Sequence, residues 1–182
     1  MYASPTRWLL LLKTIKAGSA AKDVTLIGVM TALALIFSYV EVLIPFNFGI
    51  PGVKLGLANL VIVVALYLLP IKHAFLLDIM KILTASFLFG NVMTLIYSLA
   101  GGLLSFAAMA LAKKTDKLSL IGVSVLGGVF HNLGQLITAI LVMETLKIAY
   151  YFSVLAVAGL VTGLLLGIAA EKVIHLLENQ VG

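Results

Sequence analysis

The stretch LSLIGVSVLGGVFHNLGQLITAILVM, residues Leu118–Met143, carries His131, Asn132 and Gln135 near its middle. It is long and apolar enough to span a bilayer as a helix. Because hydrocarbon offers polar side chains no hydrogen-bond partners, three of them at this depth need a protein surface or a cavity. Helical periodicity gathers the small and polar residues on one face, formed by Ser124, Gly128, His131, Gln135 and Thr138. We expect this face, with Asn132 beside it, to point away from lipid.

The composition of the whole chain also indicates membrane insertion. Of its 182 residues, 63% are hydrophobic and 10% are charged, and the mean hydropathy is +1.21. These values are typical of integral membrane proteins. The absence of cysteine excludes disulfides, thiolate metal sites and cysteine nucleophiles. The net charge of +5 does not indicate nucleic-acid binding, because the basic residues flank apolar runs.

Six apolar runs predict an all-α fold, a polytopic bundle of six transmembrane helices. The runs are Val24–Ile44, Val53–Leu69, Ala74–Phe89, Val92–Ala112, Leu118–Met143 and Ile148–Ala170. The second and third runs are short, since about 20 residues are typical of a span. Only Pro70–His73 separates them, which predicts a tight helical hairpin.

The segment before the first run is basic and only weakly apolar. Its apolar core, Trp8–Leu12, is too short for a typical signal peptide. We expect residues 1–22 to form a cytoplasmic or interfacial tail, and residues 23–182 to form one transmembrane domain.

The lysine and arginine residues predict the orientation of the bundle. With the N-terminus in the cytoplasm, nine of them fall on the inner side and two, Lys54 and Lys147, on the outer side, with Lys81 inside the third run. Cytoplasmic loops of membrane proteins carry such an excess. We therefore expect a multi-pass protein of the cell membrane with both termini in the cytoplasm.

Polar residues of other segments are predicted to meet the fifth run in the outer half of the bundle. Glu41 lies near the outer end of the first run, and Asn59 lies about one turn into the second. The loop PFNFGIPGVKLG, residues 45–56, joins these two runs and contains aromatic, proline and glycine residues. It is either an ordinary connector or a lid over a pocket. The candidate lid residues are Phe46, Asn47 and Phe48.

Asp78 and Lys81 lie three residues apart in the third run, so they are expected to pair along one helix face. Pairing lowers the cost of placing either charge in a membrane. Mutual neutralisation is the favoured interpretation. A contact with substrate, or a network that changes between states, is the alternative.

The last run contains the series Gly159, Gly163 and Gly167, one glycine in every four residues. Such a series makes a flat groove in which another helix backbone can approach closely. We expect this groove to serve internal helix packing, with a surface for a partner protein as the alternative.

The sequence lacks the motifs of several enzyme classes. It has no phosphate-binding loop for ATP hydrolysis, no group of residues with metal-ligand spacing and no nucleophile elbow. Clustered carboxylates, which would hold magnesium for diphosphate chemistry, are also absent. We therefore predict no catalytic residues, no cofactor and no metal site, and we do not expect an enzyme.

Four segments carry a resemblance to a known family: PGVKLGLANLV (residues 51–61), SLAGGLLSFAAMAL (98–111), IGVSVLGGVFHNLGQLITA (121–139) and GLVTGLLLG (159–167). They resemble the Gx transporter family, often labelled heptaprenyl diphosphate synthase component I. More distantly, the chain is similar to the substrate-binding S components of energy-coupling factor (ECF) vitamin transporters.

The resemblance to S components implies six helices and a pocket in the outer half, beneath the loop after the first helix. It also implies partners, namely a transmembrane coupling protein and two cytoplasmic ATPases. S components usually dock through small residues spaced A-x-x-x-A on the first helix. The matching positions here are Gly28 and Ala32.

These observations predict a membrane subunit that binds a small nutrient for uptake, such as a vitamin, a flavin or a quinone precursor. His131, Asn132 and Gln135 would supply hydrogen bonds, with Asn59 and Glu41 as further candidates. One alternative is an accessory subunit of polyprenyl diphosphate or quinone synthesis, and another is a stand-alone secondary transporter. In a third interpretation, the polar residues of the fifth run only hold helices together.

Overall fold

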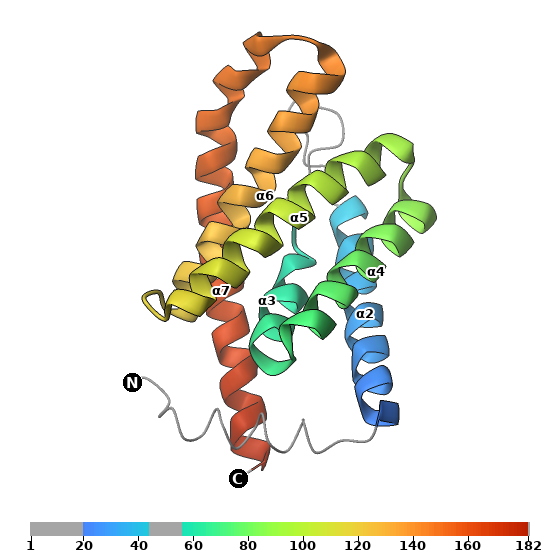
Figure 1. The fold of residues 1–182 in the computed structure, drawn as a ribbon, viewed down its shortest axis with the longest axis vertical. Helices are drawn as coiled ribbons and strands as arrows, with labels where there is room; N and C mark the ends of the chain where they lie inside the picture. The colour runs from blue at the N-terminus through green and yellow to red at the C-terminus, as the bar shows by residue number, and fades with distance from the viewer. Residues whose placement is uncertain (1–19, 44–55, 182) are drawn as a thin grey trace.

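The computed structural model describes residues 20–43 and 56–181, and every regular element in this part of the chain is helical (Figure 1). The elements are α2 (Ala20–Leu43), α3 (Asn59–Leu68), α4 (Ile71–Phe89), α5 (Val92–Thr115), α6 (Leu120–Met143), the short 3-10 helix η1 (Leu146–Tyr151) and α7 (Phe152–Val181). The predicted all-α bundle is therefore confirmed.

In the described part of the chain, four helical segments are long and apolar enough to cross a membrane. They are Val24–Leu43, Val92–Thr115, Leu120–Met143 and Leu146–Asn179. Less than half of each is buried inside the bundle, so large apolar side chains such as Leu111 and Leu141 face outward. An outer surface of this kind is stable only against lipid. The chain is a membrane protein.

The second and third predicted spans differ from these four. The helix of the second span, α3, has ten residues and begins only at Asn59. At about 1.5 Å per residue it is about half as long as the hydrocarbon layer is thick. The third, α4, has 19 residues but carries Lys72, Asp78 and Lys81.

The last two long helices form an antiparallel pair at one side of the bundle (Figure 1). Helices α6 and α7 pack along their length, and α5 crosses α6 diagonally (Figure 1). Helix α4 lies between α5 and α2, while α3 contacts α2, α4, α6 and α7. Helix α3 is therefore enclosed, and most of its residues are buried.

Glycines allow α6 and α7 to approach at backbone distance. A Cβ atom on Gly159 would lie 2.6 Å from the carbonyl oxygen of Gly128, and one on Gly163 would lie 2.7 Å from the Cα atom of Val125. Real Cβ atoms do not approach other atoms so closely. The third glycine, Gly167, contacts Ile121 in the same way. All three glycines of the α7 series lie in this internal interface.

The C-terminal end of α3 is held by a lysine of α5. The Nζ atom of Lys113 donates a hydrogen bond to the backbone oxygen of Leu66 at 2.5 Å. The same ammonium group lies 4.9 Å from the centre of the Tyr67 ring. The last carbonyl groups of a helix have no partner within the helix. The cation therefore satisfies one of them and complements the negative end of the helix dipole.

Most helices begin close to the bounds of the predicted runs, at a proline or a capping residue. Pro70 precedes α4, the Asn91 side chain caps α5, and the Ser119 side chain caps α6. Helix α7 differs at its end, because it continues to Val181 and passes the end of the predicted run at Ala170. The polar residues after Ala170 end the apolar run but do not break the helix.

Candidate functional site

His131 and Gln135 lie one turn apart on α6 and point toward α5. Their Nε2 atoms are 3.1 Å apart, and the two residues are 6% and 0% exposed. Opposite them is Gly101 of α5. A Cβ atom there would lie 3.1 Å from Cε1 of His131 and 3.0 Å from Cγ of Gln135. The glycine thus provides the space that the two polar side chains occupy.

Asn132 occupies a different side of α6. Its Nδ2 atom donates a hydrogen bond to the backbone oxygen of Leu155 in α7 at 2.8 Å. Ser124 makes a similar bond, from Oγ to the backbone oxygen of Gly163 at 2.8 Å. Asn132 therefore contributes to the α6–α7 interface, while its neighbour His131 faces the centre of the bundle.

Three residues from other segments reach the same region as His131. The carboxylate of Glu41, near the end of α2, accepts a hydrogen bond from the backbone N–H of Gly56. Gly56 has a φ of +79°, which favours glycine. A Cβ atom on it would lie 3.0 Å from Nδ2 of Asn59 and 3.6 Å from Cδ2 of His131. Gly56 thus brings Glu41, Asn59 and His131 together, although they are far apart in the sequence.

The charge pair of α4 adjoins this group. The Nζ atom of Lys81 lies 2.9 Å from Oδ1 of Asp78, with side chains that are 7% and 2% exposed. The same Nζ atom donates a 3.4 Å hydrogen bond to Oδ1 of Asn59. The side-chain amide of Asn59 therefore stands between the charge pair and Gly56. We call the resulting group the polar cluster: Glu41, Asn59, Asp78, Lys81, His131 and Gln135.

Two adjacent glycines of α5 face different residues of the polar cluster. Gly101 faces His131 and Gln135, whereas a Cβ atom on Gly102 would lie 3.4 Å from Oδ2 of Asp78. Sequence reasoning used these glycines only for the family resemblance and did not place them at the site. It also missed the contact between Asn59 and Lys81, because periodicity relates residues within one helix and not residues of two helices.

The predicted docking residues lie apart from the polar cluster. Gly28 and Ala32 are exposed on α2, and a Cβ atom on Gly28 would meet nothing within 4 Å. The predicted lid residues, Phe46, Asn47 and Phe48, lie outside the described residues.

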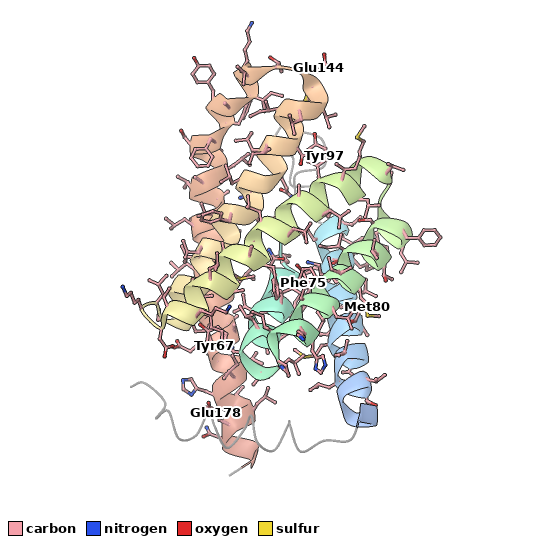
Figure 2. All side chains as sticks on the ribbon, in the orientation of Figure 1. Tyr67, Phe75, Met80, Tyr97, Glu144 and Glu178 are labelled. Carbon is pink, nitrogen blue, oxygen red and sulfur yellow. The ribbon has the colours of Figure 1, made fainter. Side chains whose placement is uncertain are left out.

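A separate groove of about 590 Å³ lies where α4 connects to α5. It is lined mainly by apolar residues, and its polar members include Ser86 and Asn91. No residue of the polar cluster lines it. Figure 2 shows the side chains of the bundle, with Phe75 and Met80 of α4 labelled.

The chemistry of the polar cluster suits the binding of a polar molecule. It contains amide, imidazole, ammonium and carboxylate groups, which together offer both donors and acceptors. Among the described residues, no group of three histidine, aspartate or glutamate side chains has the arrangement of a metal site.

Comparison with known proteins gives one family. Residues 30–173 match the family model described as heptaprenyl diphosphate synthase component I. Neither a curated protein nor a solved structure matches the chain. The matched segment contains every residue of the polar cluster and extends over most of the protein. The chain belongs to the heptaprenyl diphosphate synthase component I family.

Proposed function

We propose that this protein is the substrate-binding subunit of a nutrient transporter, similar to an S component, and that separate ATPase subunits energise uptake. The substrate would be a small molecule such as a vitamin, a flavin or a quinone precursor. The observation that carries the proposal is the polar cluster. It gathers six polar side chains from four helices of a membrane bundle, and all but the half-buried Glu41 lie in the interior, where such groups are costly and usually functional.

The direction of the polar contacts supports binding over simple helix packing. Asn132 and Ser124 bond to carbonyl groups of α7 and so hold two helices together. The contact between His131 and Gln135 instead runs along α6. These two side chains fill the space opposite Gly101 of α5.

The predicted orientation places the polar cluster toward the outside of the cell membrane. With both termini in the cytoplasm, Glu41 and Gly56 lie at the outer side, where a nutrient would arrive. The segment that joins them contains Phe46, Asn47 and Phe48, which we propose as a lid over the ligand.

The exposed face of α2 supports a role for partner subunits. Gly28 and Ala32 lie on that face and provide a flat area for another helix. We propose this area as the contact with a transmembrane coupling protein, which would in turn bind cytoplasmic ATPases.

The test is mass spectrometry of small molecules released from the protein purified in mild detergent. The wild type is compared with the variant His131→Ala/Gln135→Ala. The matched control is Thr138→Val, because Thr138 lies one turn away on the same face and bonds only within α6. We expect one compound with the wild type and the control, and none with the double variant. A compound that stays bound to the double variant would exclude this site.

A second candidate function is an accessory role in polyprenyl diphosphate synthesis, which the family description favours. It predicts that a prenyltransferase copurifies with this protein and that the length of its product changes when the protein is removed. The same purification tests both candidates. A prenyltransferase without a bound small molecule would support the accessory role and contradict nutrient binding.

A further inference from the structure

The buried pair of Asp78 and Lys81 leaves much of its hydrogen-bonding capacity unused. An ammonium group has three N–H donors and a carboxylate has about four acceptor positions. Among the described residues, Lys81 contacts only Asp78, at 2.9 Å, and Asn59, at 3.4 Å, which is the long limit of a hydrogen bond. Within residues 20–43 and 56–181, Lys81 is the one polar partner of Asp78. At least one donor and several acceptor positions therefore lack a partner.

Helix α5, which packs against α4, carries another buried polar group without a partner. Ser105 lies one turn along α5 from Gly101 and Gly102, and it is 2% exposed. Its Oγ atom has no hydrogen-bond partner among the described residues. Buried polar groups are nearly always hydrogen-bonded, and lipid supplies no partner to those that are not. The unused capacity of the charge pair therefore points to a molecule that binds there.

The charge of the pair limits what that molecule can be. Lys81 and Asp78 neutralise each other, so a further net charge beside them would be uncompensated in a medium of low dielectric constant. The partner should therefore be uncharged. It should also offer an acceptor to Lys81 and, close to it, a donor to Asp78.

We propose that Lys81 and Asp78 contact the substrate directly and recognise an uncharged group in which a carbonyl and an N–H lie side by side, as in a lactam, an imide or a ureide. This inference rests on the proposed nutrient-binding function and names the class of nutrient. The amide of Asn59 connects the pair to Gly56 and His131. The substrate would thus extend from the charge pair on α4 to His131 and Gln135 on α6.

The first variant for the test is Asp78→Leu/Lys81→Met, which replaces the pair with apolar side chains of similar volume. Replacing a buried ion pair in this way is often neutral or stabilising. We expect an unchanged or higher unfolding temperature in detergent, together with at least a tenfold loss of the bound compound, since two charge-assisted hydrogen bonds disappear. The control is Ser124→Ala, which removes a buried hydrogen bond at the α6–α7 interface and should leave the compound bound.

A second variant, Asp78→Lys/Lys81→Asp, keeps a neutral pair but exchanges the donor and the acceptor. A purely structural pair would tolerate the exchange, whereas direct recognition predicts that the compound is lost. If the exchanged variant does not fold, the apolar variant decides alone.

The outcomes separate this inference from the proposed function. A charged compound, a compound without the carbonyl and N–H edge, or one that stays bound to the apolar variant would overturn the inference and leave nutrient binding intact. The absence of any compound from the wild type would overturn both. A neutral lactam, imide or ureide that is lost from the apolar variant and kept by the control would establish the inference.

Discussion

The side-chain amide of Asn132 donates a 2.8 Å hydrogen bond to the backbone oxygen of Leu155 and so joins α6 to α7. Its chain neighbour His131 points toward α5 instead. Two adjacent polar residues of one transmembrane helix thus lie in two different interfaces. Their substitution should have separable effects on stability and on binding.

The variant Asn132→Leu should lower the stability of the bundle without removing the ligand. Leucine has a similar volume but leaves the oxygen of Leu155 without its partner, at a cost of about 1 kcal/mol. Denaturant unfolding in detergent measures this change. Thr162→Val is the control, because the Thr162 hydroxyl bonds only within α7. An unchanged stability of Asn132→Leu, or loss of the compound bound by the wild type, would contradict the assignment.

The variant Gly163→Ala should destabilise the protein strongly, whereas Gly28→Ala should not. A Cβ atom at position 163 would lie 2.7 Å from Cα of Val125, which is a backbone atom that cannot move without separating α6 from α7. At position 28 the added methyl group would meet nothing within 4 Å. We expect a loss of about 1–3 kcal/mol for the first variant and an unchanged unfolding temperature for the second. Equal effects would show that the helices do not approach as closely as described.

The variant Lys113→Met should loosen the C-terminal end of α3. It removes the hydrogen bond to the oxygen of Leu66 and the contact of the cation with the Tyr67 ring. The expected cost is about 1–3 kcal/mol, because the carbonyl group loses a charged partner. Lys114→Met is the control, since Lys114 is exposed and takes part in no contact of this kind. Thermal unfolding of both variants would reveal the difference, and a similar effect of the two would contradict this role.

The variant Gly28→Leu/Ala32→Leu should stop uptake but leave ligand binding unchanged. Both positions lie on the exposed face of α2, away from the polar cluster, so the added side chains would block only an incoming helix. Uptake by whole cells and the amount of compound bound to the purified protein measure the two effects. Full uptake by this variant would exclude the proposed docking face, and loss of bound compound would show that α2 influences the site.

The sequence predicted most of the helices because the signals at their ends are local. Pro70, Asn91 and Ser119 lie directly before α4, α5 and α6, although Ser119 falls inside the predicted fifth run. The predicted start of α3 was less accurate, since the second apolar run begins at Val53 but the helix begins at Asn59. Hydropathy alone does not show where an apolar segment becomes helical.

The site was harder to predict because its contacts join different helices. Spacing grouped His131 with Gln135, and it related Asp78 to Lys81, since both pairs lie on one helix. It also grouped Asn132 with His131, although a difference of one residue turns a side chain by about 100° around the helix axis. Interhelical distances depend on how glycines let the backbones approach, and no pattern within one segment encodes them.

The enclosure of α3 has a consequence for the biogenesis of the protein. Its ten residues are too few for the translocon to recognise as a span, so α3 must enter the bilayer together with α4. In the bilayer, α3 lacks many of its packing partners until α7, which contacts it, has been synthesised. Nascent chains that stall before α7 would expose α3 and the charged residues of α4, and we expect quality-control proteases to degrade them.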